Sequence, residues 1–257
     1  MTAPAASHRF SRVVIAFATG APSWPAIEAS LGLAAAVGAS LEGLFVEDSA
    51  LLRLSSLPLA RETSVLTGVQ RALAAGEVER ALRVHATRHA QLLAESAARR
   101  RVPWSFAVAR GQLVPQAVAH DADLIVLSPR ERHARTARQP SRPGPIATLF
   151  DASAGAQRAL AATSRLADAL GCELLVLVPD GEAQAAQALR REAREWLNAQ
   201  PVAGRTLLLA ADQAALLDTV RTSESVLLAL PATALEAWPI DLESLLARVL
   251  CPLVIAR

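Results

Sequence analysis

The sequence predicts an α/β protein in which helices cover both faces of an open parallel sheet, and three observations predict this class. Short runs that are apolar at every position alternate with longer segments whose apolar residues recur at helical spacing. Such runs are typical of strands buried on both faces and joined by crossover helices. Hydrophobic residues make up 52% of the 257 residues and charged residues 19%, which favours a large buried core. The order of runs and segments also restarts at Gly144, so we expect the fold to occur twice.

The first half of the chain contains four predicted strands separated by three helices. The strands are short apolar runs, at 13–18, 41–46, 104–109 and 124–127. The helices cover 25–38, about 69–100, and 113–120. Gly38 is a plausible end for the first helix, because glycine readily adopts the left-handed conformation that ends helices.

The long helix predicted over 69–100 has a recognisable buried face and end. Its apolar residues Leu73, Val84, Leu92 and Leu93 mark the stripe that we expect to face the core. Three arginines at 99–101 stand at its end, where positive charge suits the helix dipole.

The second half repeats this order with five strands and four helices. The strands are predicted at 146–150, 174–178, 206–209, 226–230 and 253–255. The helices are predicted at 156–170, 183–197, 214–220 and 242–249.

The two halves align as an internal duplication. An offset of 133 carries Val13 to Ile146 without a gap, but at Leu124 and Val226 the offset has fallen to 102. The first copy therefore holds about 31 extra residues, most of them in an insert at 47–68. The stretch 48–62 is apolar for a loop, and three roles remain open for it: it packs on the other copy, covers its own domain as a lid, or docks a partner protein.

These observations divide the chain into domains 1–143 and 144–257. The first carries 17 Arg against 11 acidic residues, and the second 9 Arg against 13, so their net charges differ in sign. The stretch 130–143 is basic and proline-rich, as expected of a linker. A net charge of +2 is too small for a protein dedicated to nucleic acid, so no nucleic-acid partner is expected.

Cysteine content and hydropathy indicate the compartment. Cys172 and Cys251 each stand at the start of a strand-like run, where cysteine usually acts as a small buried hydrophobe. No apolar run reaches the roughly 18 residues that span a bilayer. We therefore expect a cytoplasmic protein without a membrane partner.

Four segments carry a family resemblance. They are the turn Asp151-Ala152-Ser153, the run Ala-Asp-Leu-Ile-Val-Leu at 122–127, the segment Gly-Cys-Glu-Leu-Leu-Val-Leu-Val at 171–178, and the ending Cys-Pro-Leu-Val-Ile-Ala-Arg at 251–257. In this order and spacing, both halves resemble the universal stress protein family in a tandem arrangement with degenerate ATP-binding motifs.

The resemblance implies two flavodoxin-like domains, each with a parallel sheet of strand order 3-2-1-4-5. Family sheets often dimerise through the fifth strand, so a homodimer or an intramolecular pseudo-dimer is expected. The first copy is truncated, because 130–143 is too short for a further helix and a fifth strand. The last strand, 253–255, then has no internal twin, and pairing with a second copy of the chain is one expectation for it.

ATP-binding relatives use an acid after strand one and a Gly-x-x-Gly-x9-Gly-Ser/Thr segment after strand four. Ala18 replaces the acid in the first copy, and Ser-Pro-Arg at 128–130 replaces its glycines. Asp151 keeps the acid in the second copy, but Leu-Pro-Ala-Thr at 230–233 replaces the glycines there. The resemblance therefore implies no bound cofactor.

An alternative remains open: an adenine nucleotide, ATP, bound by the second copy. Asp151 and Ser153 would then contact the nucleoside, and Arg130 and Arg132 would hold the phosphates. Asp151 could instead cap the following helix, and the arginines could belong to a solvated linker.

No catalytic or metal site is expected. His85 and His89 stand four apart on one helix, which favours a solvated or interfacial face, and no third ligand is evident. We expect a non-catalytic, stress-associated regulatory or protein-interaction module; slow ATP hydrolysis is left open.

Overall fold

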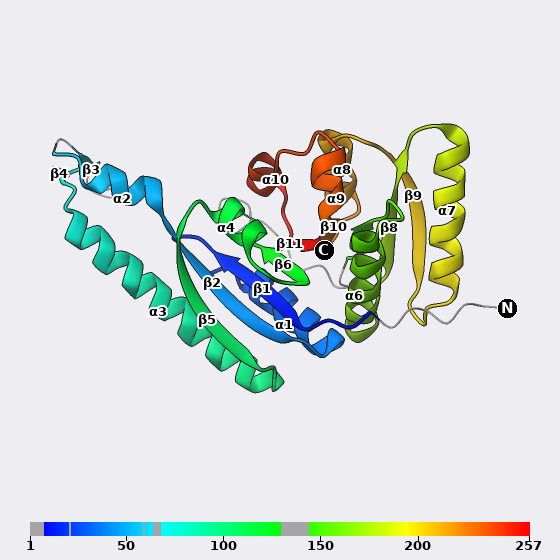
Figure 1. Cartoon of the computed structure of the whole chain (residues 1–257), viewed down its shortest axis with the longest axis horizontal. Coiled ribbons are helices and arrows are strands. Elements are labelled where there is room, and N and C mark those ends of the chain that lie inside the picture. The colour runs from blue at the N-terminus through cyan, green and yellow to red at the C-terminus, as the bar shows by residue number, and fades with distance from the viewer. Residues whose placement is uncertain (1–7, 21, 59, 64–67, 130–143) are drawn as a thin grey trace.

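The computed structural model describes residues 8–20, 22–58, 60–63, 68–129 and 144–257. Within these residues, nine strands form one continuous sheet in the order β5-β2-β1-β6-β11-β10-β7-β8-β9 (Figure 1). None of the helices described is both long and apolar enough to cross a membrane.

The first half supplies one end of this sheet. Its strands are β1 (Arg12–Phe17), β2 (Ser40–Asp48), β5 (Trp104–Gly111) and β6 (Leu124–Leu127). They are mutually parallel, and Ile15 of β1 stands in register with Gly43 of β2 and Val126 of β6. The associated helices are α1 (Trp24–Val37), α3 (Ala75–Arg100) and α4 (Leu113–Ala119).

The second half supplies the other end, with five parallel strands. They are β7 (Ile146–Leu149), β8 (Leu174–Asp180), β9 (Gly204–Ala210), β10 (Leu227–Pro231) and β11 (Leu253–Ala256). The helices are α6 (Ala154–Leu170), α7 (Ala183–Asn198), α8 (Gln213–Thr222), α9 (Ala232–Ala237) and α10 (Leu242–Arg248).

The two ends join through β6 and β11, which pair antiparallel with Val126 opposite Val254. Strand β11 thus lies between β10 and β6, and both of its hydrogen-bonding edges are occupied. This corrects the expectation that the last strand pairs with a second copy of the chain, because an edge paired within the chain cannot accept another strand.

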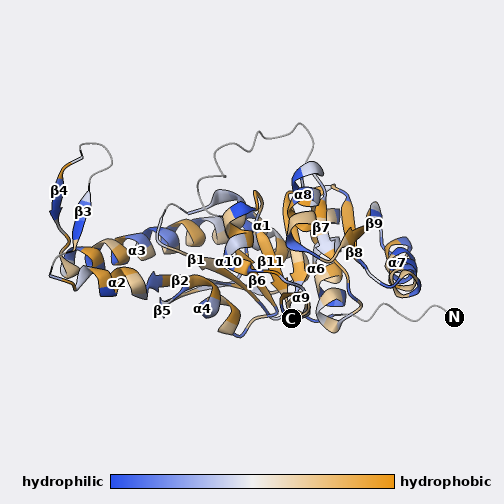
Figure 2. Ribbon diagram, turned by 90° about the horizontal axis from the view of Figure 1, so that it is seen from above, coloured by the Kyte–Doolittle hydropathy of each residue, from blue (hydrophilic) through white to orange (hydrophobic). Residues whose placement is uncertain are grey.

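Helices cover both faces of the sheet. Val13 and Ile15 point into a core formed with α1, α3, α6 and α7, whereas Val14 and Ala16 point into a core formed with α4, α8, α9 and α10. Neighbouring residues of a strand face opposite sides, so a strand covered on both sides is apolar throughout. Figure 2 shows the central strands largely in orange for this reason.

The corresponding helices α1 and α6 begin and end alike. Ser23 caps α1 by accepting the N–H of Ala26, and Ser153 caps α6 by accepting the N–H of Ala156. Gly38 and Gly171 end these helices in the left-handed conformation, at φ of 71° and 63°.

The insert forms an arm that projects from the sheet (Figures 1 and 2). The arm contains α2 (Ser49–Ser55), β3 (Arg61–Thr63) and β4 (Gln70–Ala72), which pairs antiparallel with β3 and lies just beyond the insert; the sequence predicted none of these elements. The main contacts of α2 are with α3, β2 and β5, so it packs chiefly on its own half of the chain.

The long helix differs from the prediction at its start and on its buried face. It begins at Ala75 rather than near residue 69, because β4 occupies 70–72. Val84 is 62% exposed, which corrects its placement in the buried stripe. The stripe runs instead through Val78, Leu82, His89 and Leu93. Each residue turns an α-helix by about 100°, so Val84, two residues after Leu82, points to nearly the opposite side of the helix.

Candidate functional site

A cavity of about 640 Å³ lies at the carboxyl ends of β1, β2 and β6. From β1, the chain continues to β2 on one side, and the later strand β6 pairs with the other side of β1. The cavity therefore lies at the point where the strand order of the sheet reverses. Its size is within the range of small-molecule sites. Described residues that line it include Phe17, Asp48, His89, Gln112, Ser128 and Leu246.

The ends of strands and the starts of helices position these side chains. Phe17 is the last residue of β1 and Asp48 the last of β2. The carboxylate of Asp48 caps α2, where its Oδ1 accepts the N–H of Ala50 at 2.7 Å. Leu246 comes from α10, so both halves of the chain contribute to the wall.

His89 is the most deeply buried polar group of the cavity wall, with 1% of its surface exposed. Its ring lies 4.7 Å from that of Phe17 and 5.4 Å from that of Phe45, measured between centroids. Nδ1 lies 2.7 Å from the carbonyl oxygen of His85. This burial corrects the expectation that His85 and His89 share a solvated or interfacial helix face.

The tautomer of His89 follows from that contact. A carbonyl oxygen only accepts, so Nδ1 carries the proton and donates it, and in the neutral ring Nε2 carries a lone pair. Burial lowers the pKa of His89, as do the charges of His85 and Arg88, although the hydrogen bond to His85 opposes them. Within the described part of the chain, nothing donates a hydrogen bond to Nε2.

Two acidic residues belong to the described wall of the cavity. Asp48 and Glu243 line it, and the described lining contains no arginine. Arg130 and Arg132, which the nucleotide alternative placed at the phosphates, lie outside the described residues.

Asp151 and Ser153 lie at a different place, after β7 in the second half, where they do meet. The backbone N–H of Ser153 donates to Oδ1 of Asp151 at 3.0 Å. The hydroxyl of Thr233, in α9, lies 2.8 Å from Oδ2 of Asp151, to which it donates, and 3.0 Å from Oγ of Ser153. Ser153 is the N-cap of α6, which corrects the expectation that Asp151 caps this helix, and Asp151 braces the turn before it. Thr233 was not predicted as their partner, because its approach depends on the packing of β10 beside β7.

The turn containing Asp151 is tightly packed. Ala152 has a φ of 62°, a conformation that favours glycine. A Cβ on Gly155, in the first turn of α6, would lie 3.1 Å from the carbonyl oxygen of Ala256 and 3.3 Å from Cβ of Pro231. The ends of β10 and β11 therefore pack directly against the first turn of α6.

The chain was compared with protein-family models, curated proteins and solved structures. No family model matches it, and no curated protein matches it. A universal stress protein from Archaeoglobus fulgidus DSM 4304 is similar in structure, with 13% sequence identity, coverage of 96% of this chain and 98% of that one, and a TM-score of 0.57. A protein of unknown function from Pseudomonas aeruginosa PAO1 is 11% identical over 98% of this chain and 94% of that one, with a TM-score of 0.49. At 13% identity, the likeness to the Archaeoglobus protein shows a shared fold.

Proposed function

We propose that the chain is a tandem member of the universal stress protein family and acts as a non-catalytic, stress-associated regulatory or protein-interaction module in the cytoplasm. Its repeats would be 1–143, truncated after the fourth strand, and 144–257. Two features support the tandem arrangement. The strand order β5-β2-β1-β6 of the first half matches the first four strands of β9-β8-β7-β10-β11 in the second half. The helices α1 and α6 are also capped by the same residue types, a serine at the start and a glycine at the end. The fold shared with the Archaeoglobus universal stress protein supports the family.

One observation carries the proposal that the second repeat does not use ATP. Both carboxylate oxygens of Asp151 already accept hydrogen bonds, from the N–H of Ser153 and the hydroxyl of Thr233. These two donors hold the carboxylate against its own turn and use one acceptor position on each oxygen. The glycine segment that would hold the phosphates is replaced by Leu-Pro-Ala-Thr at 230–233. In the first repeat, Ala18 offers no carboxylate at all.

The arm supports a role in protein interaction. On α2, Leu51 and Leu52 pack against the core, whereas Leu54 is 50% exposed and Leu57, just beyond the helix, is 55% exposed. The buried leucines hold the arm in place, and the exposed ones give a partner protein an apolar contact on 48–62.

Calorimetric titration of the full-length protein with ATP and ADP tests the nucleotide part. We expect no binding at millimolar nucleotide from a folded sample. Micromolar binding that disappears in Asp151→Ala, but survives in the control Asp218→Ala, would establish the alternative in which the second repeat binds adenine nucleotide. Asp218 is a suitable control because its side chain is 62% exposed and lies in the same half.

Substitutions in the arm test the interaction part. Leu54→Asp and Leu57→Asp should keep the circular dichroism spectrum and lose whichever protein the wild type captures from cell extract. Leu170→Asp, at an apolar side chain that is 47% exposed in the second half, should retain that protein. Capture that is equal in all three variants would contradict a role for the arm.

A further inference from the structure

Strand β5 forms the edge of the sheet in the first half, and no strand in the described part of the chain pairs with its outer side (Figure 1). Its inner side pairs parallel with β2, where the N–H of Leu41 donates to the carbonyl oxygen of Pro103 at 2.8 Å. The backbone groups of successive residues point to opposite sides of a strand, so those of the even-numbered residues from 104 to 110 point outward. Strand β5 therefore presents a row of backbone donors and acceptors at its outer side.

Natural sheets usually protect such an edge with charged residues, proline or bulges. The opposite edge, β9, carries this kind of protection. Arg190 and Arg194 of α7 donate to the hydroxyl of Thr206 in β9, at 3.4 and 3.2 Å. Arg205, the residue before it, is exposed. Two copies of β9 would bring these arginines together, and like charges that face each other across strands are destabilising.

Strand β5 lacks this protection over most of its length. The segment 104–109 contains neither a charged residue nor a proline. The charged side chain of the strand, Arg110, bonds to Glu47 at 2.7 Å, so its charge is compensated. Trp104 and Val108 are large apolar side chains, yet they are 42% and 52% exposed. An unprotected edge with exposed apolar side chains is suited to pairing with another strand.

The sequence of β5 is complementary to itself when two copies of the strand run antiparallel. If Ala107 faces Ala107 of the second copy, Trp104 faces Arg110, and Phe106 faces Val108. An arginine beside an indole ring and an aromatic residue beside a β-branched one are both favourable pairs. This register also gives every outward-pointing residue of the strand a partner. Moving the two-fold axis to Phe106 or to Val108 would leave one of them beyond the end of the partner strand.

We propose that two copies of this chain form a homodimer in which β5 pairs with β5 of the second copy, antiparallel about a two-fold axis at Ala107. The two nine-stranded sheets then join into one, and Trp104 and Val108 become contacts between the copies. This edge is distinct from β11, which the sequence suggested for pairing and which pairs with β6 inside the chain. The proposal goes beyond the proposed function and does not rest on it, because the arm leucines and Asp151 take no part in the contact.

A cysteine at the two-fold axis tests both the contact and its register on the full-length protein. Residue 107 would face its copy at a position without hydrogen bonds, where Cα atoms lie about 4.5 Å apart, within the span of a disulfide. Ala107→Cys should therefore form a covalent dimer under mild oxidation, and a reducing agent should reverse it.

Ser105→Cys is the matched control on the same strand. Two copies of residue 105 would lie about 14 Å apart along the paired strands, so this variant should give little covalent dimer although Ser105 is exposed. The native cysteines, Cys172 and Cys251, are 7% and 5% exposed, so the wild type should give none.

Sedimentation equilibrium measures the dimer without a cross-link. The wild type should show twice the 27.0 kDa of one chain at micromolar concentration. Val108→Lys places a charge opposite Phe106 of the second copy, so the dissociation constant of the dimer should rise at least about tenfold. Leu170→Lys, at an apolar side chain of the second half that is 47% exposed, should dimerise as the wild type does.

Four outcomes would overturn the proposal. The first is a wild type that keeps the mass of one chain up to about 0.5 mM. The second is equal cross-linking of Ala107→Cys and Ser105→Cys, and the third is a dimer that Val108→Lys leaves unchanged. The fourth is a monomer whose capture of another protein is lost in Val108→Lys, which would assign the edge to a strand of that protein.

Two further measurements keep the outcome clear. If Val108→Lys does not fold, the mass of the wild type and the two cysteine variants decide the question. Leu54→Asp, in the arm, should keep the dimer, so failure of the dimer and failure of the arm as a protein contact are distinguishable.

Discussion

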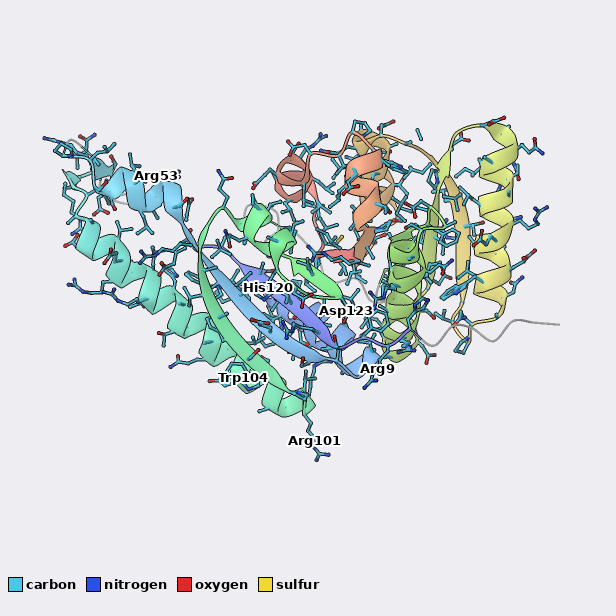
Figure 3. All side chains as sticks on the ribbon, in the orientation of Figure 1. Arg9, Arg53, Arg101, Trp104, His120 and Asp123 are labelled. Carbon is cyan, nitrogen blue, oxygen red and sulfur yellow. The ribbon has the colours of Figure 1, made fainter. Side chains whose placement is uncertain are left out.

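Asp123, immediately before β6, and Arg158 of α6 form an ion pair at 3.0 Å that joins the two halves of the chain. Asp123 also accepts hydrogen bonds from the backbone N–H groups of Ser11 and Arg12 and from the hydroxyl of Ser11. Figure 3 labels Asp123 near β6, where the two halves meet. Arg158 also donates a hydrogen bond to the carbonyl oxygen of Arg257, the residue that follows β11. The ion pair therefore lies where β6 begins and β11 ends.

Asp123→Asn should lower the free energy of unfolding by about 1–3 kcal/mol, because it removes the charge opposite Arg158 and weakens two backbone hydrogen bonds. Denaturant unfolding of this variant, of Arg158→Met and of the double variant gives the coupling between the two residues. The exposed pair of Asp218 with Arg221 is the control, and Asp218→Asn should cost less than about 0.5 kcal/mol. A coupling near zero would show that the pair does not stabilise the junction.

The pKa of Asp123 predicts how the junction responds to acid. Burial, the largest single effect, would raise this pKa, but the hydrogen bonds from Ser11 and Arg12 and the charge of Arg158 together lower it below 3.8. The stability that this group contributes is therefore present above about pH 3.8 and is lost as the pH falls through the lower pKa of the folded state. Below that pH, the wild type and Asp123→Asn should converge in unfolding free energy, and a difference that persists at pH 2 would contradict this account.

His89 gives a second pH dependence at milder acidity. Its folded pKa lies below 6.5, mainly through burial, with His85 and Arg88 as nearby charges and Asp48 and Glu243 across the cavity. As the pH falls, His89 therefore becomes protonated in the unfolded chain before it does so in the folded protein. The stability that the neutral His89 contributes is present above about pH 6.5 and declines below it. Unfolding free energies measured between pH 8 and pH 5 should fall more steeply for the wild type than for His89→Phe. Parallel curves would mean that His89 titrates alike in both states.

Close packing of α1 on α6 makes a steric prediction. A Cβ on Gly32 of α1 would lie 2.8 Å from Cδ1 of Leu166 of α6. Gly32→Val should therefore cost about 1–3 kcal/mol of unfolding free energy through overpacking. Gly76, in the first turn of α3, has nothing within 4 Å of its Cβ position, so Gly76→Ala should instead stabilise by up to about 1 kcal/mol. Thermal unfolding of both variants checks the contrast, which equal shifts would contradict.

The central strands of the sheet were predictable from sequence because each is an apolar run buried on both faces, whereas the edge strands β5 and β9 are partly exposed. The pairing of β6 with β11 was not, although the missing fifth strand of the first half was visible in the chain length. An apolar edge such as Leu253–Ala256 accepts any partner of suitable length, and only the three-dimensional arrangement selects Val126 as the residue opposite Val254.

The candidate site was less predictable than the fold. Motif comparison directed attention to Asp151 in the second half, whereas the cavity lies in the first, around a histidine on α3. A helical wheel anchored on Leu82 and Leu93 would place His89 on the buried stripe, so a signal was present in the sequence. The arm was missed because β3 and β4 have three residues each, too few to show a period.

Burial of the two cysteines makes a final prediction. Burial raises the pKa of the Cys251 thiol to about 12 and raises that of Cys172 as well, and the two side chains are 5% and 7% exposed. Only the thiolate reacts with a disulfide reagent, so at pH 8 the thiolate of Cys251 should be about a thousandfold scarcer in the folded protein than in the unfolded one. Titration with an aromatic disulfide should release two equivalents of thiol in guanidinium chloride but react far more slowly with the native protein. In Cys251→Ala, the remaining thiol of Cys172 should still react slowly with the reagent in the native protein, because Cys172 is also buried. Fast native labelling of one equivalent that this variant abolishes would show that the end of the chain, before β11, opens readily.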